Sequence, residues 1–284
     1  MKSIKNILVP TDFSVTARNA YAYAKLLAQS LDAHITVVHI NEYFIPVSEI
    51  AVAPLSEHED DRLAEAMETF ISDDIRGESG DTSILVKNNV KSKILRGDPV
   101  SRLEELSKTA DLIVMGTTGL QDFMSKIIGS TSLEVANKAH CPVILVPRDA
   151  RWKPIDKIMY ASNYDSTTPK MVREITDFAV MINAAIHFVH IEEFTDNDEK
   201  VTNIIWDELF STSDPSLAFE IHTIYGEDRI KELKEYSEKN KINLMAFVSK
   251  HRNFWQNLMH NSVTQDIAIS TTTPMLIMHL DDAL

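Results

Sequence analysis

The sequence of 284 residues predicts an α/β protein built from two tandem doubly wound units, each with a five-stranded parallel sheet. Short runs of β-branched residues and Leu alternate with amphipathic helical patterns, which is typical of a parallel sheet with helices on both faces. The same series of patterns then occurs a second time in the same order. An ordered internal repeat of this kind indicates a duplicated unit.

The first half is expected to contain five strands and four helices. The strands are short apolar runs at about residues 4–10, 34–40, 90–96, 111–116 and 142–147. The helices are expected near 15–31, 57–75, 99–108 and 130–139. The first helix carries Ala, Tyr and Leu at helical spacing, and Ser14 precedes it as an N-cap residue.

The second half repeats this order of elements. Ile4–Phe13 matches Ile155–Tyr164 at an offset of 151 residues, and Cys141–Val146 matches Thr273–Met278 at an offset of 132. The repeated strands are expected near 155–161, 185–191, 218–225, 243–248 and 274–279. We therefore expect two domains, 1–148 and 153–284, with a linker too short to act as a free tether.

Composition limits the function. The formal charge of −14 disfavours nucleic acid, because phosphate contacts need clustered Lys and Arg. The apolar runs are too short to span a bilayer, and the first five residues lack an apolar signal core, so a cytoplasmic protein is expected. The lone Cys141 excludes an internal disulfide or a Cys-based zinc cluster. No metal site is expected, because no set of His and carboxylates shows ligand spacing.

Three of the seven glycines form a spaced group that predicts phosphate binding. Gly116-Thr117-Thr118-Gly119 is followed after nine residues by Gly129-Ser130. The group lies between a strand pattern and a helix pattern. Glycine lets backbone N–H groups approach an anion, and a helix N-terminus supplies unpaired donors and a positive dipole end. The simpler interpretation is that these glycines only form tight turns.

This motif, together with the opening Val9-Pro10-Thr11-Asp12, resembles the ATP-binding motif of the universal stress proteins. With the repeat, the resemblance covers nearly the whole chain. It implies a sheet order of 3-2-1-4-5 in each half, with a ligand crevice where strands 1 and 4 end. It also implies that the last strands of the two halves pair or pack edge to edge as an intramolecular pseudo-dimer. Further homodimerisation is left open.

The resemblance assigns roles to individual residues. Asp12 would accept hydrogen bonds from the ribose, and Pro10, Thr11 and Val38 would line the adenine pocket. Met115 would pack under the base. The phosphates would be held by Gly116, Thr118, Gly119, Gly129, Ser130, Thr131 and Ser132. The ligand is expected to be ATP, ADP or AMP, with Mg²⁺ as a candidate ion on the phosphates. For Asp12, Val38 and Met115, ordinary helix-start and core roles are the alternatives.

The second half lacks the glycines of this motif. Val248, His251 and Asn261 stand where the first half has Gly116, Gly119 and Gly129, and Asn163 replaces Asp12. We therefore expect only the first half to bind nucleotide in this way. Lys250, His251, Arg252 and His260 form a small basic cluster, for which a solvated loop is the favoured interpretation.

No catalytic group stands out beside the glycine loop, so nucleotide-dependent binding without efficient turnover is expected. Two alternatives remain open: a slow ATPase or nucleotidyl-transferring enzyme on the same fold, and a nucleotide-free scaffold for an unknown protein partner. In the scaffold hypothesis, the apolar segment 43–55 and the acidic surface would bind the partner.

Overall fold

The computed structural model describes residues 3–42, 57–72, 89–117, 130–162, 167–192, 203–209, 217–225, 229–249 and 272–279. The strands of the first half are β1 (Asn6–Pro10), β2 (His34–Asn41), β3 (Val90–Arg96), β4 (Leu112–Thr117) and β5 (Val143–Pro147). Those of the second half are β6 (Lys157–Ser162), β7 (Ala185–Glu192), β8 (Phe219–Tyr225), β9 (Leu244–Ser249) and β10 (Met275–His279).

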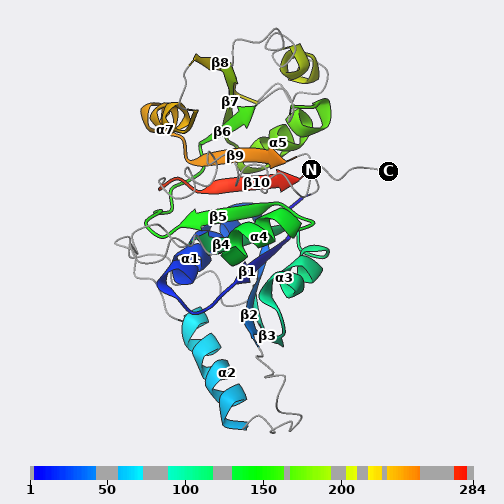
Figure 1. Ribbon diagram of the computed structural model, residues 1–284, viewed down its shortest axis with the longest axis vertical. Helices are drawn as coiled ribbons and strands as arrows, with labels where there is room; N and C mark the ends of the chain where they lie inside the picture. Colours follow the sequence, from blue (N-terminus) through cyan, green and yellow to red (C-terminus); the bar gives the residue numbers. More distant parts are fainter. Residues whose placement is uncertain are drawn as a thin grey trace.

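All ten strands belong to one sheet, which runs along the length of the molecule (Figure 1). The strand order is β3-β2-β1-β4-β5-β10-β9-β6-β7-β8. Read inward from either end, each half follows the order 3-2-1-4-5, and neighbours within a half are parallel. The predicted doubly wound arrangement is therefore confirmed.

The two halves meet at their last strands. β5 and β10 pair in antiparallel fashion, with Leu145 opposite Met275 and Val143 opposite Ile277. The sheet is thus continuous across the joint (Figure 1). This pairing covers two sheet edges that would otherwise expose unpaired backbone groups. The expected edge-to-edge contact of the two C-terminal strands is confirmed.

Helices cover both faces of the sheet. They are α1 (Val15–Leu31), α2 (Glu57–Ser72), α3 (Pro99–Ser107), α4 (Ser130–Lys138), α5 (Pro169–Ile182) and α7 (Arg229–Asn240), with a further helical segment at 203–209. One core lies under α1, α2 and α5, and the other lies under α3, α4 and α7. Within the described part of the chain, no helix is long and apolar enough to cross a bilayer.

The linker between the halves is fastened to α1. The side-chain amide of Asn19 donates to the carbonyls of Pro147, Arg148 and Ala150 at 2.9, 3.1 and 2.9 Å. Beside it, the rings of Tyr23 and Trp152 meet edge to face, with centroids 4.5 Å apart. These contacts agree with the expectation that the linker is no free tether.

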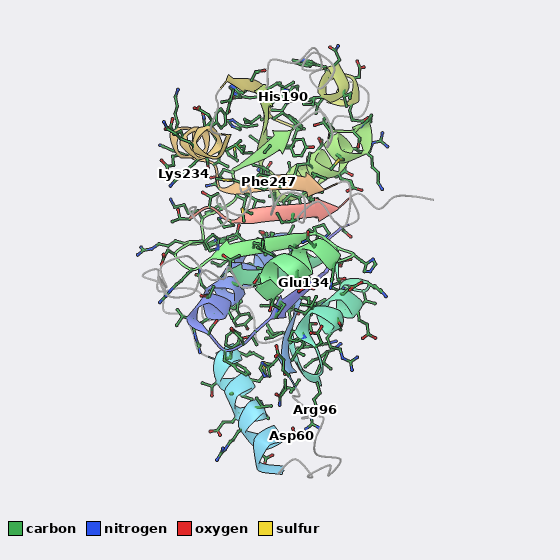
Figure 2. The ribbon with its side chains drawn as sticks, in the orientation of Figure 1. Asp60, Arg96, Glu134, His190, Lys234 and Phe247 are labelled. Carbon is green, nitrogen blue, oxygen red and sulfur yellow. The ribbon has the colours of Figure 1, made fainter. Side chains whose placement is uncertain are left out.

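An ion pair lies at the end of the first half that is far from the joint. Arg96, the last residue of β3, pairs with Asp60 in the first turns of α2, and Figure 2 shows both side chains at the end of the molecule opposite the second half. At the other end of α2, Phe70 is buried against Phe13 and Tyr21. These contacts attach α2 to the edge of the sheet at β3.

Candidate functional site

A pocket of about 290 Å³ lies at the carboxyl ends of β1 and β4, on the edge of the sheet where the sequence predicts a crevice. This volume is near the lower end of the range for small-molecule sites, about 300–1,000 Å³. The pocket brings together eight of the predicted site residues, which are Pro10, Thr11, Asp12, Val38, Met115, Gly116, Thr131 and Ser132.

The turn from β1 to α1 fixes the position of Asp12. The Phe13 N–H donates to the Thr11 hydroxyl (2.9 Å), and the Ser14 N–H donates to Asp12 Oδ1 (3.0 Å). Ser14 in turn caps α1 by accepting the Ala17 N–H, as predicted. Asp12 therefore has the local helix-start role that was its alternative interpretation. Its side chain remains exposed, and within the described residues its second oxygen is left for solvent or a ligand.

Phe13 and His39 contact each other beside this turn. Phe13 adopts a positive φ of 64°, which is uncommon for a bulky residue. Its ring lies 4.4 Å from the His39 ring, centroid to centroid. His39 Nδ1 lies 2.9 Å from the Thr11 carbonyl, and this contact requires a proton on Nδ1. His39 is therefore satisfied by a backbone partner, and it also lines the pocket.

Gly116 has a packing role at the end of β4. A Cβ atom at this position would lie 2.7 Å from Thr16 Cγ2, 2.8 Å from the Thr16 carbonyl oxygen and 2.9 Å from its carbonyl carbon. Two of these atoms belong to the backbone of the first turn of α1, so a side chain would force strand and helix apart. The Gly116 carbonyl also accepts the Ser132 hydroxyl at 2.9 Å. Ser132 thus connects the start of α4 to β4. Because its hydroxyl proton is donated to the Gly116 carbonyl, the hydroxyl can only accept a hydrogen bond from a ligand.

Val38 and Met115 form the apolar floor of the pocket. Both are buried, at 1% and 5% exposure, within the core under α3 and α4. The Val38 carbonyl accepts the Thr11 N–H at 2.8 Å, so only its second lone pair is open to a ligand. Both residues therefore have the core-packing role that was their alternative interpretation, and both also face the pocket.

The phosphate end of the predicted motif lies largely outside the described residues. Thr118, Gly119 and Gly129 are among the residues that the structure does not describe, and α4 begins at Ser130. Thr131, in the first turn of α4, lines the pocket with its side chain partly exposed. The N-terminus of α4, where the first N–H groups have no partner within the helix, therefore lies at the same pocket as Asp12.

The pocket wall is acidic rather than basic. Asp12 and Glu42 line it, and no Lys or Arg does so in the part of the chain that the structure describes. An anion there would depend on backbone N–H groups, hydroxyls and the dipole of α4, or on a bound cation. Sequence reasoning missed Thr16, Glu42, Pro99 and Leu103 as wall residues. The predicted sheet topology could have indicated them, because the carboxyl ends of β2 and β3 lie on the same edge of the sheet as those of β1 and β4.

The equivalent place in the second half is built differently. Val248 stands at the Gly116 position and is 5% exposed. α1 begins at Val15, whereas α5 begins at Pro169, one turn later relative to the repeat offset of 151. Thr167, the residue at the Thr16 position of the repeat, therefore precedes α5 instead of lying in its first turn. Asn163, the 250–260 basic cluster and the segment 43–55 lie outside the described residues.

A second polar group, absent from the sequence predictions, lies between β7, β8 and α7. His187 is 2% exposed; its Nδ1 lies 2.8 Å from the Tyr236 hydroxyl and 3.8 Å from Glu220 Oε2. His222 Nε2 bonds the same Glu220 oxygen at 2.7 Å. Burial lowers the pKa of His187, against the opposing effect of Glu220. The bond from His222 holds the pKa of Glu220 below its usual value.

The fold and the pocket define a tandem, doubly wound α/β protein with a pocket where strands 1 and 4 of the first half end. The model of the universal stress protein family matches residues 3–147. The chain therefore belongs to the universal stress protein family.

Individual relatives agree with this assignment. A universal stress protein of Methanocaldococcus jannaschii is 30% identical over 153 residues, which cover 51% of this chain and 82% of that protein. One from Synechocystis is 20% identical over 96% of this chain and 99% of its own length. The crystal structure of a universal stress protein from Archaeoglobus fulgidus covers 98% of this chain and 99% of its own, with 17% identity and a TM-score of 0.74. The last likeness shows that the fold extends over both halves.

Proposed function

We propose that the first half of this chain binds an adenine nucleotide, ATP, ADP or AMP, in the pocket between the ends of β1 and β4. The observation that supports it is a coincidence of two independent features. A motif read from the sequence and a pocket found in the structure involve the same residues, among them Asp12, Met115 and Thr131.

The pocket wall offers suitable groups to the base, the ribose and the phosphates of a nucleotide. Val38 and Met115 offer an apolar floor for a base. Asp12 offers a free carboxylate oxygen to ribose hydroxyls, since only one of its oxygens is bonded to Ser14. The N-terminus of α4 offers N–H donors to phosphate.

A bound Mg²⁺ would offset the negative charges of the pocket wall and of the phosphates. The wall contains carboxylates but no described Lys or Arg, and Mg²⁺ binds through carboxylates and substrate phosphates. Glu42 is the described residue that would hold it or its waters, since the free oxygen of Asp12 is assigned to the ribose. Among the described residues, no Lys or Arg lines the pocket to stabilise the charge of a transferring phosphoryl group, and we propose binding rather than efficient turnover.

The second half would not share this mode of binding. Val248 occupies the position of the glycine that the first half uses. A single nucleotide per chain is therefore expected.

Calorimetric titration of the full chain with ATP, ADP and AMP, with and without Mg²⁺, tests this function. Asp12→Ala should weaken binding about tenfold to a hundredfold, the usual cost of one charge-assisted hydrogen bond. Thr131→Val should weaken it about two- to tenfold. Gly116 is unsuitable as a test, because a side chain there clashes with Thr16 whatever the ligand.

Matched controls keep the experiment specific. Asp61→Asn removes a carboxylate charge from the exposed surface of α2, and Thr69→Val removes a helical hydroxyl there. Neither should change nucleotide affinity. Absence of heat and of a thermal shift with all three nucleotides would rule the proposal out. Tighter ATP binding by Asp12→Ala would show that Asp12 only repels phosphate and is no ribose ligand.

A further inference from the structure

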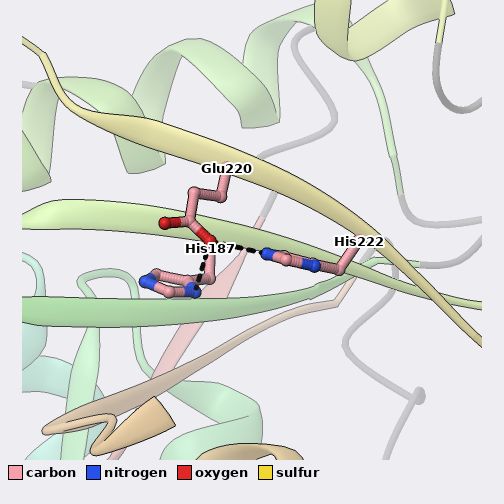
Figure 3. A group of neighbouring side chains, drawn as sticks. All are labelled: His187, Glu220 and His222. Atoms are coloured by element: carbon pink, nitrogen blue, oxygen red, sulfur yellow. Dashed lines mark hydrogen bonds and ion pairs between the residues drawn. The ribbon is translucent and has the colours of Figure 1, made fainter.

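We propose that His187, Glu220 and His222 form a binding site for a divalent transition-metal ion, with Zn²⁺ as the ion that the donor set favours. Figure 3 shows the three side chains converging between β7 and β8. One ligand atom from each residue lies within 4.8 Å of the other two. The site is in the second half and is independent of the nucleotide pocket.

Sheet register brings these residues together. His187 on β7 lies directly opposite Glu220 on β8, and His222 follows two residues later on the same face of β8. The α7 helix covers this face, where Tyr236 meets the rings of His187 and His222. All three donor residues are thus held on adjacent strands, the rigid kind of support that precise metal sites need.

The three ligand atoms reach tetrahedral spacing after side-chain rotations. Zn–N and Zn–O bonds of about 2.0–2.1 Å separate neighbouring ligand atoms by about 3.3 Å in a tetrahedron. His187 Nδ1 and Glu220 Oε2 are 3.8 Å apart, and Glu220 Oε2 and His222 Nε2 are 2.7 Å apart. The first separation must shrink and the second must widen, each by about half an ångström. The two histidine nitrogens lie within 4.8 Å of each other, so they must also approach, by up to about 1.5 Å.

The donor chemistry points to Zn²⁺. Two imidazoles and one carboxylate make up the ligand set of zinc sites that keep a fourth position for water. Ca²⁺ and Mg²⁺ prefer all-oxygen ligands. An entry path is present, because the side chains of Glu220 and His222 are 58% and 38% exposed while His187 is buried at the base.

The first half serves as an internal comparison. β2 and β3 pair Thr36 with Lys91, the positions that β7 and β8 give to His187 and Glu220. Lys93 stands where the second half has His222. The fold is therefore built without these donors in one half, so the scaffold itself does not require a His–Glu–His group. Two lysines at the equivalent positions exclude a cation there.

Two features of the site oppose metal binding and make the test sharp. Tyr236 occupies His187 Nδ1 with a 2.8 Å hydrogen bond, which an ion at that nitrogen would displace. Lys157 carries a positive charge close enough to act on His187 and Glu220. A purely hydrogen-bonded network is thus the competing interpretation of the same residues.

The experiment is titration of the chelator-treated full chain with Zn²⁺, followed by calorimetry, and with Co²⁺, followed by visible absorption. The expected result is one tight site and a Co²⁺ spectrum of four-coordinate type. Glu220→Gln, at an exposed position, and His222→Ala, at a partly exposed one, should each weaken Zn²⁺ binding more than tenfold and abolish that spectrum. The control His34→Ala removes an exposed histidine from β2 and should change neither.

Tyr236→Phe separates the two interpretations. It removes the hydroxyl that competes for His187, so Zn²⁺ affinity should stay equal or rise. Zn²⁺ should also raise the unfolding temperature of the wild type and of His34→Ala but not of His222→Ala. The proposal is overturned if the wild type takes up no Zn²⁺, or if the tight site persists in a Glu220→Gln/His222→Ala double variant. Loss of binding in Tyr236→Phe would likewise overturn the assigned ligand set.

Discussion

Gly116 offers the sharpest test of how the pocket is built, through the substitution Gly116→Ala. The new methyl group would lie 2.7–2.9 Å from three atoms of Thr16. Carbon atoms in contact are normally about 3.5–4.0 Å apart, so the overlap is close to an ångström. Because two of the three atoms are backbone, no rotamer change of Thr16 removes it.

The loss of stability caused by Gly116→Ala depends on which atoms must move to relieve the overlap. Overpacking of a buried site usually costs about 1–3 kcal/mol, and a clash with helix backbone belongs to the upper part of that range. We therefore expect a loss of about 3 kcal/mol in the free energy of unfolding of the first half. Urea unfolding followed by far-ultraviolet circular dichroism measures it, as a lower midpoint with an unchanged slope for that transition.

A second substitution identifies the cause. Thr16→Ser removes Cγ2, the nearest atom, but leaves the two backbone atoms in place. The Gly116→Ala/Thr16→Ser double variant should therefore recover less than half of the lost stability. Substitutions at neutral surface positions usually change the free energy of unfolding by less than about 0.5 kcal/mol. If Gly116→Ala changes it by no more than that, the close approach of β4 and α1 is refuted. Complete rescue by Thr16→Ser would refute the role of the helix backbone.

Three further predictions concern the rest of the molecule. Asn19→Ala should cost about 1–2 kcal/mol and increase protease cleavage of the linker, because the amide holds three linker carbonyls; an uncut linker in the variant would contradict this. Thr168→Ala should cost about 1 kcal/mol by chemical denaturation, since its hydroxyl caps α5; Thr109→Ala, at an exposed position, is the control. Burial raises the pKa of Cys141 to about 12, above about 8.5 in the unfolded chain, so only the unfolded thiol ionises between these values. Stability should fall as pH rises through this range by up to about 1.4 kcal/mol per pH unit, and Cys141→Ala should reduce that slope.

The strands and helices were largely predictable from sequence because their signals are local. β1 to β5 were placed within two residues of their observed ends from short β-branched runs. α1 was placed at 15–31, its observed bounds, because Ser14 marks its start and apolar residues follow at helical spacing. The repeat then carried the same assignment to the second half, whose strands also lie within two residues of the prediction.

The features that were missed depend on contacts between distant segments. The reason for a glycine at position 116 is the approach of Thr16, a hundred residues earlier in the chain, which no local pattern encodes. The His187–Glu220–His222 group depends on the register of β7 against β8. The alternation Glu220-x-His222 was visible in the sequence, but its partner on the next strand was not identifiable without that register.

The antiparallel joint between β5 and β10 has a consequence for how such a molecule can change. In an assembly of two identical chains, every substitution is made twice, so a valine that fills one crevice fills its twin as well. Fusion into a single polypeptide removes that constraint. One half of the continuous sheet is then free to change its residues while the other keeps them, as Val248 at the position of Gly116 illustrates.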